Sequence, residues 1–213
     1  MKTDDLILML ASDAGVVAPR VWRRRYALAV GAGIAGATLL MVMLLGVRPD
    51  IADAARLPMF WVKLAFPLVL AAIALLAVVR LSRPGVPLGR VPSALAAPVL
   101  VMWLFAAVAL SGAAPDERSV MLFGETWAGC LVYVTILSLP AFIALLWVMK
   151  TLAPTRLALA GAAAGLLAGA LGAAVYALHC PEMDAPFLGV WYLLGMLIPA
   201  MLGAAVAPRL LRW

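Results

Sequence analysis

Charged side chains are scarce in this chain. Asp, Glu, Lys and Arg make up 12% of its 213 residues, whereas a typical soluble domain has about 25%. The chain has only two cysteines and one histidine, too few for a disulfide framework or for a metal site built from several histidines. It also contains no Gly-rich phosphate-binding loop, no HExxH zinc motif and no GxSxG nucleophile elbow. These absences exclude a secreted disulfide scaffold and argue against an enzyme.

Apolar side chains are correspondingly abundant. Hydrophobic residues make up 67% of the chain, and the mean hydropathy is +1.11. A helix needs about 20 apolar residues to cross the hydrocarbon core of a bilayer, and six stretches of the chain meet this length. We therefore expect an all-α integral membrane protein, in which the domain at 26–213 is a six-transmembrane-helix bundle. The expected spans are residues 26–46, 58–79, 92–112, 127–149, 157–178 and 187–207.

Basic residues are distributed unevenly between the two sides that these spans define. The N-terminal segment, the second and fourth connections and the C-terminal end carry twelve of the sixteen Lys and Arg, and the alternate connections carry three. Because short cytoplasmic loops are enriched in Lys and Arg, we expect both termini in the cytoplasm. The remaining cation, Lys63, lies near the outer end of the second span, and we expect its ammonium group to snorkel to the aqueous interface.

The segment at 1–25 precedes the first span and is predicted to bind a partner. Its last residues, Arg23–Arg25, resemble the start of a signal peptide, but the apolar run that follows is longer than the roughly 7–15 residues of a signal sequence, so we expect no cleavage. Its first residues combine an N-cap, two acidic residues and an apolar stripe at helical spacing. Helices on a membrane surface usually carry Lys or Arg on the polar face. The acidic pattern therefore favours a soluble protein partner over the membrane surface. The residues of this predicted binding helix are Thr3, Asp4, Asp5, Leu6, Ile7 and Leu10.

The two cysteines are the first candidates for chemistry. Cys130 and Cys180 are both expected near the outer face of the membrane, which is oxidising in bacteria, so they could form a disulfide. Nitrogen and oxygen ligands beside Cys180 could instead help the thiols to bind a metal ion, and these candidate auxiliary ligands are His179, Glu182 and Asp184. Alternatively, the cysteines are simply small apolar residues of the bundle.

The fifth span contains a ladder of small residues, Gly161, Gly165 and Gly169. Such a ladder lets a neighbouring helix approach closely. We expect it to pack against another helix of the same bundle, with homodimerisation through this face as the alternative. No Asp, Glu or His lies near the middle of any predicted span, so the groups that ion-coupled transport requires are missing.

Several motifs together resemble one known family. They are the sequence Met-Lys-Thr-Asp-Asp-Leu-Ile at 1–7, the sequence Tyr-Ala-Leu-His-Cys-Pro-Glu at 176–182, the pair Trp191-Tyr192 and the glycine ladder. With six expected spans, this pattern is similar to the NrsF-type membrane anti-sigma factors over essentially the whole chain. Members of that family hold an extracytoplasmic-function sigma factor at the inner membrane and release it under heavy-metal or oxidant stress. The resemblance implies that Cys130 and Cys180 are the sensing pair, and that the sigma-facing segment lies within 1–25.

The sequence therefore predicts a multi-pass anti-sigma factor of the bacterial inner membrane, with no catalytic activity and no required cofactor. Its expected partners are an extracytoplasmic-function sigma factor and the lipid bilayer, without direct binding to nucleic acid. A heavy-metal ion such as zinc, cadmium or a copper-like ion is the candidate metal signal. A small-solute membrane transporter is the main alternative. A quinone-linked thiol oxidase is a third interpretation, against which the missing second cysteine pair argues.

Overall fold

The computed structural model describes Met9 and residues 19–152 and 154–212, and this part of the chain contains helices and no strand. Six of the helical segments are long and apolar enough to cross a membrane, as expected from the apolar runs. The predicted partner-binding helix around Thr3 to Leu10 lies outside the described residues, apart from Met9. The long helices are α2 (Pro19–Leu44), α4 (Pro58–Leu81), α5 (Val91–Gly112), α7 (Trp127–Lys150), α8 (Leu157–Tyr176) and α10 (Leu193–Leu210).

The first long helix begins earlier than the sequence analysis expects. α2 starts at Pro19 rather than near Tyr26, so Arg23–Arg25 lie on the helix itself and not in a linker before it. A proline fits the first turn of a helix because the N–H that it lacks would have no partner there. The charged first turns therefore lengthen α2 beyond its apolar part.

Short helices occupy connections that the sequence analysis treats as loops. These are α3 (Ile51–Ala54), α6 (Pro115–Phe123) and α9 (Ala185–Phe187), and a π-helical segment, η1 (Leu188–Tyr192), joins α9 to α10. α6 has a proline in its first turn and then Asp116 and Glu117, acidic residues that are favourable near a helix N-terminus.

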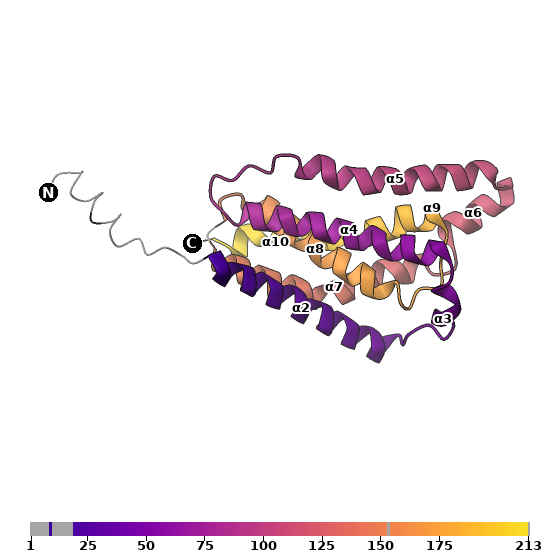
Figure 1. The fold of residues 1–213 in the computed structure, drawn as a ribbon, viewed down its shortest axis with the longest axis horizontal. Helices are drawn as coiled ribbons and strands as arrows, with labels where there is room; N and C mark the ends of the chain where they lie inside the picture. The colour runs from indigo at the N-terminus through magenta and orange to yellow at the C-terminus, as the bar shows by residue number, and fades with distance from the viewer. Residues whose placement is uncertain (1–8, 10–18, 153, 213) are drawn as a thin grey trace.

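The long helices of the bundle run between two ends (Figure 1), which differ in their residues. The start of α2 and the end of α10 lie at one of them, which we call the basic end, with residues 19–25, 81–91, 150–152, 154–156 and 205–212. We call the opposite end, with residues 45–57, 113–130 and 177–192, the thiol end because it holds both cysteines. Each long helix runs between the two ends.

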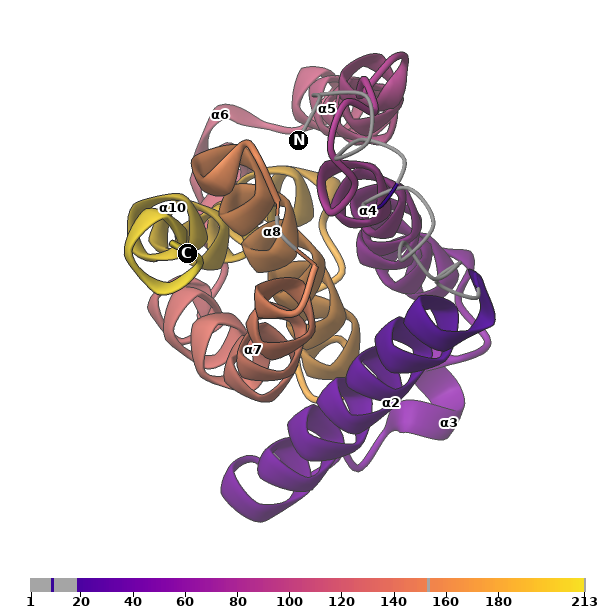
Figure 2. The same cartoon turned by 90° about the vertical axis from the view of Figure 1, so that its left-hand side faces the viewer.

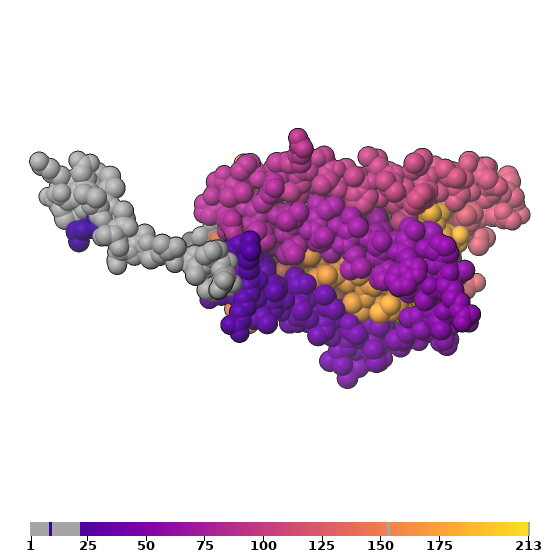
Figure 3. Space-filling model, viewed as in Figure 1, coloured from indigo at the N-terminus to yellow at the C-terminus, as the bar shows by residue number. Residues whose placement is uncertain are grey.

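α8 forms the centre of the bundle. Most of its residues are buried, and it packs against α2, α4, α7 and α10. Figure 2 views the bundle from the basic end and shows α8 between its neighbours. In the space-filling view, orange atoms of the α8 region are visible at the bottom of a depression between α2 and α4 (Figure 3). α5 lies at the edge of the bundle, and few of its residues are buried.

The glycine ladder of α8 faces α10 within the same chain. A Cβ atom on Gly161 would overlap the carbonyl oxygen of Gly203, and one on Gly165 would overlap that of Pro199. A Cβ on Gly169 would lie 2.8 Å from the carbonyl oxygen of Met196. Only glycine permits this separation of the two backbones, so the ladder serves packing inside the bundle.

Candidate functional site

The thiol end brings the two cysteines together. Cys130 lies in the first turn of α7, and Cys180 lies in the turn that follows α8. Both are free thiols with 0% of their surface exposed. They lie within electrostatic range of each other and of the Lys63 ammonium group. The prediction that both cysteines share one end of the bundle therefore agrees with the geometry.

The local sequence fixes the position of Cys180. α8 ends at Tyr176, and the next residues continue as tight turns, in which the backbone N–H of Cys180 donates to the carbonyl oxygen of Tyr176 at 3.0 Å. Pro181 follows directly, and the residue before a proline disfavours the helical conformation. The helix therefore ends before Cys180, and the Cys180 side chain is buried in the bundle.

Lys63 lies inside the bundle, next to the turn that carries Cys180. Its side chain is completely buried, and its Nζ donates to the carbonyl oxygens of Cys180 at 2.6 Å and of Glu182 at 2.7 Å. It also lies 5.7 Å from the centroid of the Tyr192 ring. The expectation that Lys63 snorkels to the interface is therefore wrong. Two carbonyl oxygens and an aromatic face replace water around the ammonium group, so it has no need to reach the interface.

Aromatic rings line the thiols on the side of α7, α8 and η1. The ring of Tyr176 lies 6.2 Å from that of Tyr133 and 6.0 Å from that of Tyr192. Phe187 lies 6.4 Å from Tyr192. The hydroxyl groups of Tyr176 and Tyr192 are both neighbours of the Cys180 thiol. The thiols are therefore buried beside a cluster of aromatic rings and one buried cation.

The three candidate auxiliary ligands do not gather around the thiols. His179 donates from Nδ1 to the carbonyl oxygen of Gly46 at 2.9 Å. The Glu182 carboxylate accepts from the Glu125 backbone N–H at 2.9 Å and from the Thr126 hydroxyl at 3.2 Å. Asp184 precedes α9, and burial together with nearby Glu182 raises the pKa of its carboxyl group. Among the residues that the structure describes, no three His, Cys, Asp or Glu side chains gather to hold a metal ion.

A second cation ties the thiol end to α2. The backbone N–H of Arg48 donates to the carbonyl oxygen of Leu178 at 3.2 Å, and its Nη1 donates to that of Cys180 at 3.3 Å. Its guanidinium group also forms a two-point ion pair with Asp50, in which each N–O distance is 2.7 Å. This pair lowers the pKa of the Asp50 carboxyl group and raises that of Arg48. The segment that leaves α2 is thus held against the turn that carries Cys180.

Sequence reasoning missed both of these anchoring residues. From the sequence, Arg48 is one of the three cations in the alternate connections, and Lys63 is a cation expected to snorkel to the interface. The one available signal was a lysine inside an otherwise apolar span, since such residues usually face the interior of a bundle and have a partner there. The partners themselves could not be found because they are backbone carbonyl groups more than a hundred residues away.

The basic end has the opposite character. In the described residues it carries no Asp or Glu, and its cations include Arg23–Arg25 on α2. The guanidinium group of Arg83 lies over the ring of Trp22, 4.2 Å from its centroid. A polar cavity of about 210 Å³ lies beside Arg83, with Thr155 and Arg156 also in its wall.

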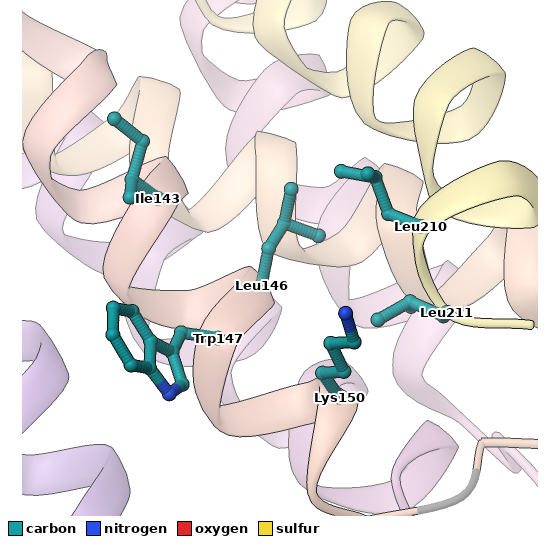
Figure 4. A pocket seen from close by; sticks show the side chains of 6 residues that line it. All are labelled: Ile143, Leu146, Trp147, Lys150, Leu210 and Leu211. Atoms are coloured by element: carbon teal, nitrogen blue, oxygen red, sulfur yellow. The ribbon is translucent and has the colours of Figure 1, made fainter.

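An apolar groove of about 490 Å³ opens at the same end between α7 and α10. Figure 4 shows that Trp147 lies at one side of this groove and Leu210 at the other, with the Lys150 ammonium group between the two helices. A surface with many cations and no described acidic residue is complementary to a negatively charged partner.

Comparison with known proteins assigns this chain to a class, the negative regulators of sigma factors. The chain belongs to the NrsF family, because the family model described as "Negative regulator of sigma F" matches residues 10–213. It is 58% identical to the probable anti-sigma-F factor NrsF of Azospira oryzae, with both chains covered completely. It is 40% identical to the anti-sigma-F factor NrsF of Caulobacter vibrioides, again over both whole chains. No solved structure matches the chain. The resemblance inferred from the motifs is thereby confirmed, and membership of this family indicates regulation rather than catalysis.

Proposed function

We propose that this protein is a membrane-embedded anti-sigma factor that holds an extracytoplasmic-function sigma factor at the inner face of the bacterial inner membrane. Reaction of Cys130 and Cys180 at the outer face releases the sigma factor. The observation that carries this proposal is the pair of free, buried thiols at the end of the bundle opposite the basic end. The names of the relatives, both anti-sigma-F factors, support the partner.

The proposed orientation follows from the charges. Six helices of sufficient length and apolarity, together with a concentration of Arg and Lys at one end, match a bundle with its basic end in the cytoplasm. The thiol end then faces the periplasm, which is an oxidising compartment. In this arrangement the segment at 1–25 lies on the same side as the sigma factor.

Two kinds of reaction fit the thiol pair. A peroxide-class oxidant accepts two electrons from the two thiols: an S–S bond forms, the O–O bond breaks, and both thiol protons leave with the reduced oxygen atoms. Alternatively, each thiol loses its proton and the two thiolates bind a soft metal ion. Either product requires the sulfur atoms to move relative to the neutral thiols, and so changes the packing of α7 against the turn after α8.

The signal has a physical route to the partner side. The turn with Cys180 is bonded to the segment that follows α2 through Arg48, and α2 continues as one helix to the basic end. A signal shifts an equilibrium only by its different affinity for the two states. A tenfold release of the sigma factor needs about 1.4 kcal/mol of such coupling, which is comparable to a single hydrogen bond to a charged group.

The test is a pull-down of the cognate sigma factor on the full chain in detergent micelles. We expect binding under reducing conditions and release after treatment with peroxide or with a soft metal ion. The double variant Cys130→Ser, Cys180→Ser should bind and fail to release, while Ser138→Ala, which changes another buried residue of α7, should behave like the native chain. Normal release from the double variant would overturn the proposed sensor. Absence of sigma-factor binding in every state would overturn the proposed partner.

A further inference from the structure

Both thiols of the thiol end are inaccessible in the closed bundle. Cys130 and Cys180 have 0% exposed surface, so no metal ion or oxidant reaches either sulfur atom while the bundle is closed. Both thiols belong to the buried core cluster, but Cys130 lies on the long helix α7, whereas Cys180 lies in a short turn whose other residues are exposed or half-buried. Displacement of the turn at 178–184 is therefore the smaller movement that uncovers a thiol.

Lys63 forms two hydrogen bonds to the backbone of this turn. Its ammonium group donates to the carbonyl oxygens of Cys180 and Glu182, which lie on either side of Pro181, at 2.6 and 2.7 Å. Lifting the turn breaks both bonds at once and separates the ammonium group from its two protein acceptors. Hydrogen bonds from a charged donor are stronger than those between neutral groups. Lys63, a side chain on α4, therefore adds to the cost of exposing the thiol, because its two short bonds must break when the turn opens.

The turn has other hydrogen bonds to the rest of the bundle: the Arg48 backbone N–H donates to the Leu178 carbonyl oxygen at 3.2 Å, and His179 Nδ1 donates to that of Gly46 at 2.9 Å. Arg48 reaches the Cys180 carbonyl oxygen at 3.3 Å, longer than the contact from Lys63, and its guanidinium group is shared with the half-exposed Asp50. The Glu182 carboxylate bonds at its outer side with the Glu125 backbone N–H. Lys63 is the one cation with 0% exposure among the described residues, and both of its bonds to the turn are short, at 2.6 and 2.7 Å.

We propose that Lys63 is a latch residue, a positioning residue whose two carbonyl contacts keep the turn at 178–184 closed over Cys130 and Cys180. Its effect on signalling rests on the proposed sensing function, but the closure itself does not. The latch sets how often the turn opens, and therefore how much oxidant or metal ion is required before the thiols react. The residue thus controls the threshold of the site and takes no part in its chemistry.

The experiment measures the rate at which a charged, membrane-impermeant maleimide labels each cysteine of the reduced full chain in detergent, with site assignment by mass spectrometry. Lys63→Met keeps the length of the side chain and removes its donors, and we expect it to speed labelling of Cys180 by about tenfold or more, as follows from the loss of two charge-assisted hydrogen bonds. Lys63→Arg, which keeps a cationic donor, should label more slowly than Lys63→Met. Lys150→Met, the same change at the basic end, is the matched control and should label like the native chain.

Two results would overturn the latch. One is a Lys63→Met chain that labels at the native rate, and the other is one that labels more slowly, since that would mean that the cation activates the thiols instead of covering them. Size-exclusion chromatography and circular dichroism report whether the variant folds. If it does not fold, hydrogen exchange of the native chain decides the matter: the amide groups of the turn must open less often than those of α6, which lack a buried cation.

The labelling test separates this inference from the proposed function. It requires no sigma factor, so an unchanged rate overturns the latch and leaves the anti-sigma role intact. Release of a sigma factor from the Cys130→Ser, Cys180→Ser variant would instead overturn sensing and leave the latch intact. If both hold, Lys63→Met should release the sigma factor at about a tenth of the peroxide concentration that the native chain requires, because the open population rises in the same proportion.

Discussion

The carbonyl oxygen of Gly203 occupies the space that a Cβ atom on Gly161 would need, and the carbonyl oxygen of Gly161 does the same at Gly203. The two backbones thus meet without an intervening side chain. In an apolar environment, where burial of apolar side chains gives little drive for association, such close contact is a main source of helix–helix attraction.

Substitution in this contact should destabilise the bundle. We expect Gly161→Leu to lower the free energy of unfolding by about 1–3 kcal/mol or more, because an inserted side chain forces α8 away from α10. Gly31→Ala, at a position with nothing near its Cβ, is the control and should be neutral or slightly stabilising. Thermal unfolding in detergent checks both, and equal melting temperatures for the two variants would contradict the packing described for α8.

The orientation of the bundle can be read from exposed positions at its two ends. In a chain with Cys130→Ser and Cys180→Ser, Ser119→Cys at the thiol end should react with an impermeant maleimide in intact cells. Val86→Cys at the basic end should react only after the inner membrane is opened. Both native residues are exposed, so access to the reagent depends on the side of the membrane. The reverse pattern would invert the proposed topology.

Asp184 should make stability depend on pH. Burial raises the pKa of its carboxyl group above the ordinary value of 3.8. Below pH 3.8 the carboxyl group is protonated in both the folded and unfolded chain; as the pH rises through the raised folded value, the folded state loses the advantage of holding the proton. Asp184→Asn should therefore raise the melting temperature at pH 7 and change it little at pH 3.5. Its side chain makes no capping bond that the change would remove, and an equal shift at both pH values would contradict this origin.

Metal binding, if it is the signal, should depend on the two thiols alone. His179 and Glu182 are engaged with backbone groups, and no third ligand joins the cysteines in the described part of the chain. We expect His179→Gln and Asp184→Asn to retain metal-induced release of the sigma factor within about twofold, and Cys180→Ser to lose it. Loss of the metal response in His179→Gln, with an intact peroxide response, would show that the imidazole is a ligand.

The sequence predicts those parts of the architecture that depend on residues close together in the chain. Six apolar runs of sufficient length determine six helices, and counting spans is enough to place Cys130 and Cys180 at the same end. The spacing of Gly161, Gly165 and Gly169 indicates a close helix contact, although it does not identify α10 as the neighbour. Each of these inferences needs only the period of a helix and the thickness of a bilayer.

The parts that were missed depend on contacts distant in sequence. Lys63 is buried because the fold brings the carbonyl groups of Cys180 and Glu182 to it. Every residue has a backbone carbonyl group, so the sequence does not indicate which of them will bind a distant side chain. The apolar pattern also gave no sign of η1. The same holds for the length of α2, whose first turns are basic and therefore outside the apolar run used to define the span.

The contact between α2 and α7 has a mechanical consequence. Cβ atoms on Gly33 and Gly36 would lie 2.6 Å from that of Ala141 and 2.7 Å from that of Pro140, so the two helices press together near the middle of α2. α2 has 26 residues, a rod of about 39 Å at about 1.5 Å per residue. Because α2 is one continuous helix, a movement at one of its ends is transmitted past this contact to the other end. A tilt that follows the turn of Cys180 would therefore bear on the contacts at the other end of α2, where the hydroxyl groups of Tyr26 and Ser82 share a buried hydrogen bond.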